Sequence, residues 1–271
     1  MNTDLFNELD TALNNAATSR RDALRQAGRL GGVAALSVLP LYGMASKVMA
    51  NNFGPAGTGD IDILNYALTL EYLERYFYEI GTETSGLIAS ADRALFETIR
   101  DDEIAHVAFL RSAISMAGGT PVSLDREAFD FTAGGTLPTF SDYDTFKLLA
   151  QGFEDTGVRA YKGQAANINT PDYLEAALQI HSVEARHAAA VRRLRGTSGW
   201  ITNAEGPAAI ANVYGAGDPA STFPSEANVM QGGLNLQAML TGYTMAEITE
   251  AFDEPLDMGT VVNDIADPFF A

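Results

Sequence analysis

The sequence predicts an all-α protein whose main part is a four-helix bundle with one long crossover connection. Apolar residues recur at spacings of three and four over four stretches, which is the period of an amphipathic helix. A few residues join the first stretch to the second and the third to the fourth, whereas about 23 residues separate the two pairs. We therefore expect two antiparallel hairpins joined by a connection that runs the length of the bundle. The four stretches are 60–82, 90–117, 141–166 and 171–195.

Residues 1–50 precede the predicted bundle and have the pattern of an export signal with a linker. The pair Arg20–Arg21 is followed by the apolar run 31–41 and then by small residues, and the pair resembles a twin-arginine signal. This run is too short for a free-standing membrane span, which needs about 20 residues. We expect an extracytoplasmic protein, periplasmic or secreted, with no stable membrane span after export. The alternative is an amphipathic N-terminal helix, because Ala23 replaces the usual bulky apolar residue.

The bundle is expected to occupy residues 51–196. Residues suited to helix ends stand near its predicted helix boundaries. They are Ser90 before the second helix, Gly118–Gly119 after it, Ser141 with Asp144 at the start of the third, and Thr170–Pro171 at the start of the fourth.

Residues 197–271 form a predicted acidic extension of irregular structure and short helices. No lysine or arginine follows Arg195, so the ten acidic residues from Glu205 to Asp267 have no local cation. Short helical pieces are expected near 207–214, 234–240, 244–252 and 258–266, and Thr244 with Glu247 forms a capping box for the third. We interpret the extension as a solvated acidic cover packed on the bundle; attraction of cations is the alternative.

The two predicted hairpins repeat one polar pattern, in which a Glu is followed by a Tyr seven residues later and by Glu-x-x-His on the next helix. The pattern consists of Glu71, Tyr78, Glu103 and His106 in the first hairpin and of Glu154, Tyr161, Glu184 and His187 in the second. The first Glu precedes the second by 32 residues in one hairpin and by 30 in the other. These nearly equal offsets indicate a duplicated helical hairpin.

This pattern predicts a site for two metal ions. Residues three apart lie on one helix face, so each Glu-x-x-His pair can direct a carboxylate and an imidazole to one point. Four carboxylates and two imidazoles suit a pair of iron or manganese ions. The predicted ligands are Glu71, Glu103, His106, Glu154, Glu184 and His187. The alternative is a set of solvated helix faces, with Glu103 near Arg100 or Arg111 and Glu184 near Arg192.

Over residues 60–195, the order of these ligands on the bundle resembles the ferritin-like di-iron carboxylate superfamily. Residues 68–74 and 251–256 further resemble the ferritin-like domain proteins related to plant desiccation-related proteins, which have many bacterial members with export signals. The chain has no cysteine, so the peroxidase chemistry of rubrerythrins that depends on a rubredoxin-like site is not implied. The C-terminal extension has no counterpart in cage-forming ferritins, and an iron-storage cage is not implied either.

Other polar residues near the predicted ligands have alternative roles. Glu74 competes with Glu71, but its equivalent in the second hairpin is Gly157, so Glu74 is expected beside the ligands or paired with Arg75 or Tyr78. Tyr78 and Tyr161 are candidates for hydrogen bonds to ligand carboxylates, for redox work or for packing.

The third histidine and three aspartates are not predicted to be metal ligands. His181 is expected to be an ordinary polar residue, because it lies roughly 9 Å along the helix from His187. Asp101, Asp102 and Asp155 adjoin predicted ligands and are candidates for orienting the histidines of neighbouring helices.

The net charge and the lack of cysteine exclude several classes of function. The formal net charge of -18 repels nucleic acids and anionic lipids, so no nucleic-acid partner is expected, and the lack of cysteine excludes thiol-ligated metals. The expected partners are metal ions with O2 or H2O2, and assembly as a homo-oligomer stays open. Two functions remain: an oxidoreductase of ferroxidase or peroxidase type in stress protection, and a non-catalytic desiccation or stress protein whose metal stabilises the fold.

Overall fold

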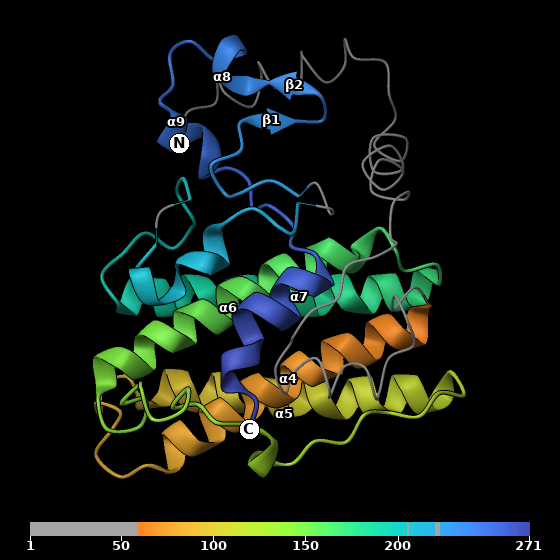
Figure 1. The fold of residues 1–271 in the computed structure, drawn as a ribbon, viewed down its shortest axis with the longest axis vertical. Helices are drawn as coiled ribbons and strands as arrows, with labels where there is room; N and C mark the ends of the chain where they lie inside the picture. Colours follow the sequence, from red (N-terminus) through yellow and green to blue (C-terminus); the bar gives the residue numbers. More distant parts are fainter. Residues whose placement is uncertain (1–58, 205, 220–222) are drawn as a thin grey trace.

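The computed structural model describes residues 59–204, 206–219 and 223–271, so the predicted export signal lies outside the described residues. Within this part of the chain, four long helices form the bundle (Figure 1). They are α4 (Asp60–Glu83), α5 (Arg93–Met116), α6 (Tyr143–Ala165) and α7 (Pro171–Leu194). The all-α bundle predicted from the sequence is confirmed. Among the described helices, none is both long and apolar enough to cross a membrane.

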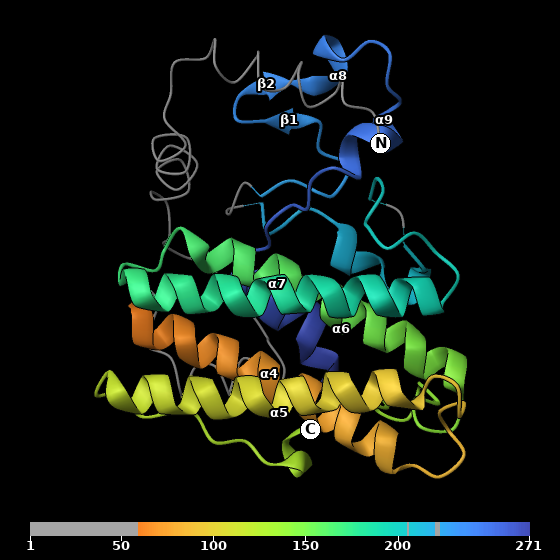
Figure 2. The same cartoon turned by 180° about the vertical axis from the view of Figure 1, so that it is seen from behind.

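The helices pack as two hairpins, α4 with α5 and α6 with α7, and both views place α5 and α7 on the same side of the bundle (Figure 2). The hydroxyl of Tyr143 donates to Asp92 at 2.8 Å, so α5 and α6 begin at the same end. At the other end, the Asp60 carboxylate accepts hydrogen bonds from the backbone of Asn169 and Thr170, so α4 and α7 begin together there. The connection from α5 to α6 therefore runs the length of the bundle.

The helix starts differ slightly from the predicted ones. Helix α5 begins at Arg93 after Asp92, rather than after Ser90, because residues 90–92 form a turn. The cap of α6 is Asp142, whose carboxylate accepts from the backbone of Thr145 at 2.8 Å, whereas the Ser141 hydroxyl donates to the Pro138 carbonyl. At the end of α5, Gly118 has a φ of +80°, which allows the two carbonyl contacts that close the helix, as predicted.

Aromatic side chains fill the end of the bundle where α5 and α6 begin. Phe77 stacks on Phe146 with ring centroids 4.7 Å apart, and Phe96 and Phe153 meet the same pair edge-on. A Cβ at Gly81 would lie only 2.3 Å from the Phe146 ring, so the glycine makes this packing possible. The aromatic layer excludes water from one end of the bundle.

The C-terminal extension consists of short elements, including a hairpin that the sequence did not predict. Strands β1 (Met230–Gln231) and β2 (Leu234–Asn235) pair across Gly232–Gly233, which both have positive φ, as a tight hairpin turn requires. The other elements are η2 (Ala208–Tyr214), α8 (Leu236–Met239), α9 (Met245–Thr249), α10 (Met258–Thr260), η3 (Val261–Ala266) and η4 (Asp267–Phe269); η1 (Arg126–Ala128) lies in the crossover. The predicted capping box of Thr244 and Glu247 is present in α9.

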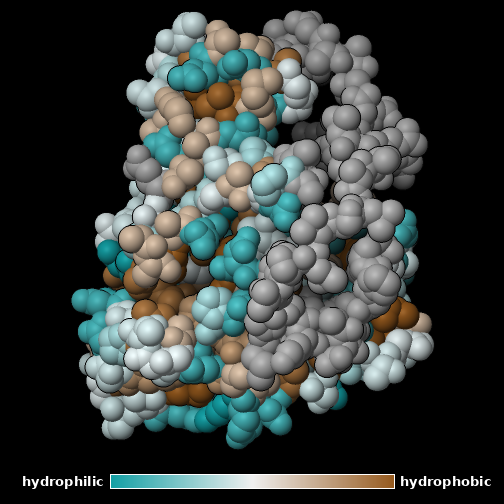
Figure 3. Space-filling view, in the orientation of Figure 1, coloured by the Kyte–Doolittle hydropathy of each residue, from teal (hydrophilic) through white to brown (hydrophobic). Residues whose placement is uncertain are grey.

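The residues around β1, β2, α8 and α9 form a small lobe that projects from the bundle (Figures 1 and 3). The lobe has its own apolar cluster of Leu236, Leu240 and Ile248. By contrast, Val261, Val262 and Ile265 join the main core, and the backbone of Ala271 donates to the Ala128 carbonyl in the crossover. The extension is therefore packed on the bundle, and part of it completes the bundle core.

One buried arginine fastens the extension to α6. Arg159 is completely buried, and its Nε lies 2.7 Å from Oε1 of Glu226, which is also inaccessible to solvent. The guanidinium also donates to backbone carbonyls of the extension, namely those of Val213, Gly215, Pro224, Glu254 and Pro255. Glu226 is thus a buried ion-pair partner, which corrects the expectation that the acids of the extension have a purely solvated role.

We predict that Arg159→Met lowers the free energy of unfolding by about 3–5 kcal/mol, because it leaves the Glu226 charge buried without a partner. Adding Glu226→Gln to Arg159→Met should recover part of this loss, since it removes the stranded charge. Urea unfolding would measure both variants. Arg126→Met is the control, because its pair with Glu83 is exposed and should be worth less than about 1 kcal/mol. A double variant as unstable as Arg159→Met alone would contradict the role given to the ion pair.

Candidate metal centre

All six predicted ligands converge inside the bundle. Helix α4 supplies Glu71, α5 supplies Glu103 and His106, α6 supplies Glu154, and α7 supplies Glu184 and His187. The four glutamates have no exposed surface. Four carboxylates in a space closed to water carry a large electrostatic cost unless cations or protons offset their charge.

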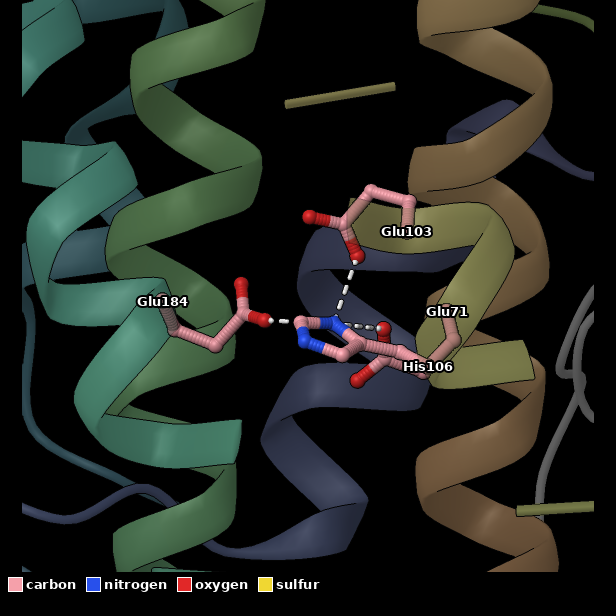
Figure 4. A group of neighbouring side chains, drawn as sticks. All are labelled: Glu71, Glu103, His106 and Glu184. Carbon is pink, nitrogen blue, oxygen red and sulfur yellow. Dashed lines mark hydrogen bonds and ion pairs between the residues drawn. The ribbon is translucent and has the colours of Figure 1, made fainter. Parts of the chain in front are cut away.

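His106 lies at the centre of the first half of this cluster (Figure 4). Its Nδ1 is 3.1 Å from Oε2 of Glu71, 3.1 Å from Oε2 of Glu103 and 3.2 Å from Oε1 of Glu184. Figure 4 shows the imidazole between Glu184 on one side and Glu71 and Glu103 on the other. Carboxylates from three helices thus approach one imidazole nitrogen.

His187 has the equivalent position in the second half. Its Nδ1 is 3.0 Å from Oε1 of Glu103 and 3.4 Å from Oε2 of Glu154. Glu103 therefore directs one oxygen to each histidine, and the two imidazole rings are 6.4 Å apart.

Within the described residues, the potential ligand atoms form two groups, in each of which all atoms lie within 4.8 Å of one another. The first group is Glu71, Glu103, His106 and Glu184, and the second is Glu103, Glu154, Glu184 and His187. Because Glu103 and Glu184 belong to both groups, the two candidate cation sites would be adjacent and would share these two carboxylates.

The hydrogen-bonding state of the cluster fits a metal site. In the part of the chain that the structure describes, buried oxygens of Glu103, Glu154 and Glu184 and the Nδ1 of His187 lie near one another but make no well-aligned hydrogen bond. Buried polar atoms are normally paired, so this concentration of unpaired ligand atoms calls for another partner. Mixed carboxylate and imidazole donors suit iron and manganese.

Without metal, protons must offset part of the negative charge. Burial, followed by the negative charge of Glu71, raises the pKa of Glu103 to about 8. Burial disfavours the charged form of His187, but Glu154 and a hydrogen bond with Glu103 outweigh it and raise the pKa of His187 to about 12. The pKa of His106 is raised in the same way, against burial, by hydrogen bonds with Glu103, Glu184 and Glu71. Metal binding would therefore displace protons.

The alternative of solvated salt bridges is wrong, because the arginines proposed as partners bind elsewhere. Arg100 pairs with Asp101, Arg111 donates to the Tyr72 hydroxyl, and Arg192 pairs with Asp155. Glu103 on α5 and Glu184 on α7 are completely buried inside the bundle instead.

Tyr78 and Tyr161 form crossed hydrogen bonds between the two hairpins. Tyr78 on α4 donates to Oε1 of Glu154 on α6 at 2.5 Å, and Tyr161 on α6 donates to Oε1 of Glu71 on α4. Each tyrosine therefore holds a ligand of the other hairpin. Each bond fixes the orientation of a carboxylate, and it leaves the second oxygen free to face the histidine side of the cluster.

Only one of the three aspartates proposed to orient a histidine does so. Asp102 lies 3.0 Å from Nε2 of His187, whereas Asp101 binds Arg100 and Asp155 binds Arg192 and Tyr214. A carboxylate on the outer nitrogen of a ligating histidine fixes the ring and its tautomer. Asp102 has no acidic equivalent in the second hairpin, because Val183 precedes Glu184 where Asp102 precedes Glu103.

His181 and Glu74 lie outside both groups of ligand atoms. Glu74 is nevertheless buried, and Arg75 and Tyr78, its expected partners, contact Glu79 and Glu154 instead. A Cβ at Gly157 would lie 3.3 Å from an oxygen of Glu74 and 3.2 Å from an oxygen of Glu184, so the glycine makes room for both side chains.

Glu74 is therefore a fifth buried carboxyl group beside the cluster. Burial, followed by the charge of Glu184, raises its pKa well above the usual range. This shift favours the protonated form of Glu74 beside the candidate ligands. The sequence located Glu74 near the site but did not predict this state.

The model of a protein family described as a ferritin-like domain matches residues 59–197. The matched segment contains all four long helices and all six predicted ligands. A comparison with curated proteins found no match.

We predict that Tyr78→Phe and Tyr161→Phe each weaken metal binding about 10- to 100-fold, because each removes the hydrogen bond that orients one ligand carboxylate. Titration with Mn(II), followed by calorimetry, would measure the affinity. The control is Tyr76→Phe, since the Tyr76 hydroxyl donates to the Leu124 carbonyl in the crossover. Equal affinities for all three variants would count against the orienting role.

We also predict that Mn(II) affinity increases with pH through and beyond pH 8, because the pKa of Glu103 is raised to about 8 and that of His187 to about 12. Below pH 8 a proton on the Glu103 carboxyl group and a proton on the His187 imidazole must both leave when these groups bind a metal, and above pH 8 the imidazole proton must still leave. Affinity should therefore rise about tenfold per pH unit for each proton released. Calorimetry in two buffers of different ionisation enthalpy would count these protons. Binding that is independent of both pH and buffer would contradict the prediction.

Proposed function

Because the chain belongs to the ferritin-like domain family, we propose that its bundle holds two iron or manganese ions and reacts with O2 or H2O2 in stress protection. The observation that carries this proposal is the pair of ligand groups that share Glu103 and Glu184. Two adjacent sites with shared carboxylates suit reactions in which two metal centres act together.

Held by these six residues, two metal(II) ions would supply two electrons, which together with two protons would reduce O2 to H2O2, or H2O2 to two waters. The protein's residues set the conditions for this exchange. Four carboxylates match the charge of two divalent ions and favour a further rise in positive charge on oxidation. The buried carboxyl group of Glu74 lies beside the cluster, where it could donate or accept a proton as electrons are transferred.

The crossed tyrosines and Asp102 keep the ligands in place during a change of metal charge. Tyr78 and Tyr161 hold one oxygen of Glu154 and of Glu71, and Asp102 holds His187. The four glutamates are buried away from bulk water, so the effective dielectric constant at the site is low and the interaction of each carboxylate with a cation is strong.

The second candidate is a stress or desiccation protein whose metal only stabilises the bundle. The unpaired oxygens of Glu103, Glu154 and Glu184 favour it, because a cation would relieve a large cost of burial in the metal-free fold. The two candidates differ in whether the bound metal turns over an oxidant.

Anaerobic loading with Fe(II) or Mn(II), followed by stopped-flow mixing with O2 and with H2O2, separates them. For the redox protein we expect oxidant consumption above that of free metal, lost in Glu103→Ala and Glu184→Ala. Glu97→Ala, at an exposed position of α5 paired with Arg93, is the control and should react like the wild type. Consumption equal to that of free metal, together with a large rise in Tm on metal binding, would assign the stabilising role instead.

A further inference from the structure

An apolar cavity lies inside the bundle, next to the candidate metal centre, with a volume of about 20 Å³. A space of this size holds a molecule as small as water or a diatomic gas. Residues of all four long helices line it. Its lining includes Leu70 and Tyr161 towards the metal centre and Phe109, Tyr173 and Ala176 towards the surface.

The inner end of the cavity is one side chain away from the ligands. Tyr161 lines the cavity, and its hydroxyl donates to Oε1 of Glu71. Leu70, which precedes Glu71 on α4, lines it as well. A small molecule in the cavity would therefore contact the tyrosine that holds a ligand carboxylate.

The outer end of the cavity reaches the surface between α5 and α7. Phe109 on α5 is 44% exposed, and Tyr173 and Ala176 on α7 are half-buried. The rings of Phe109 and Tyr173 can change rotamer at this boundary, which opens and closes a path for a small solute.

The lining also determines which solute can enter. It contains no aspartate, glutamate, lysine or arginine, and its polar side chains are three tyrosines and Gln164. H2O2 would lose most of its hydrogen bonds to water on entering such a space, at a cost that O2 does not incur. The small volume and the apolar lining of the cavity therefore favour the entry of O2 over that of H2O2.

We infer that this cavity is the entry route of dioxygen to the metal centre, and that O2 rather than H2O2 is the oxidant that reaches the ligands through it. This inference rests on the proposed function and selects one of its two oxidants. It assigns Tyr161 a second role as the inner boundary of the route, beside its hydrogen bond to Glu71.

The test fills the cavity without touching a ligand. Ala177 lines the cavity and is buried, so Ala177→Leu should occupy its space, whereas Ala108→Leu makes the same change at an exposed position of α5 outside the lining. We expect Ala177→Leu to slow oxidation by O2 about tenfold, equivalent to about 1.4 kcal/mol of added barrier. Oxidation by H2O2 and the affinity for Mn(II) should stay at wild-type values, and Ala108→Leu should change none of the three.

Gas binding gives a readout that does not depend on activity. In crystals of the wild type under krypton pressure, the gas atom should occupy the cavity, and in Ala177→Leu it should not. Ala113→Val, also in the lining, is the second variant if Ala177→Leu does not fold. A cavity without krypton, an unchanged O2 rate in the filled variants, or an equal loss of rate with H2O2 would each overturn the inference. Absence of oxidant consumption by the loaded wild type would overturn the proposed function itself.

Discussion

The burial of four carboxylates in the middle of the bundle is the constraint on which the rest of the structure depends. Glu71, Glu103, Glu154 and Glu184 are inaccessible to solvent, and their mutual repulsion must be offset within a few ångströms. The two histidines, the crossed tyrosine hydrogen bonds and the aspartate behind His187 all serve this purpose. The long crossover acts at the level of topology: it lets two equivalent hairpins face each other, which brings their acids onto one axis.

Helix α6 links this polar centre to the C-terminal extension. Glu154 and Tyr161 face the cluster, while Asp155 binds Arg192 on α7 and accepts a hydrogen bond from Tyr214 of the extension. Arg159 binds Glu226 and the carbonyls of the extension. The extension therefore fixes α6 against α7 from outside, and the position of the ligands depends on residues that are remote from them in the chain.

Much of the bundle and its cluster could be predicted from sequence, because both depend on local periodicity. The helical period located four helices, and the repeated Glu-x-x-His spacing selected residues that the structure brings together. The residues that hold the ligands from outside the repeated pattern could not be predicted, since their contacts depend on how the helices rotate against each other. Asp102 and Asp155 each stand next to a predicted ligand in the sequence, yet only Asp102 contacts a histidine. The burial of Glu226 and the cavity beside Tyr161 also arise from packing between distant segments, which leaves no periodic signal.

The crossed tyrosine bonds have a consequence for the lifetime of a bound ion. Neither hairpin alone carries a complete ligand set, and each holds its carboxylate in place through a hydroxyl group of the other. An opening that separates the hairpins would break both hydrogen bonds and expose the carboxylates together. Release of a bound ion by this opening would be tied to the cooperative unfolding of the bundle, so its rate would depend on the kinetics of the fold as well as on the affinity of the ligands.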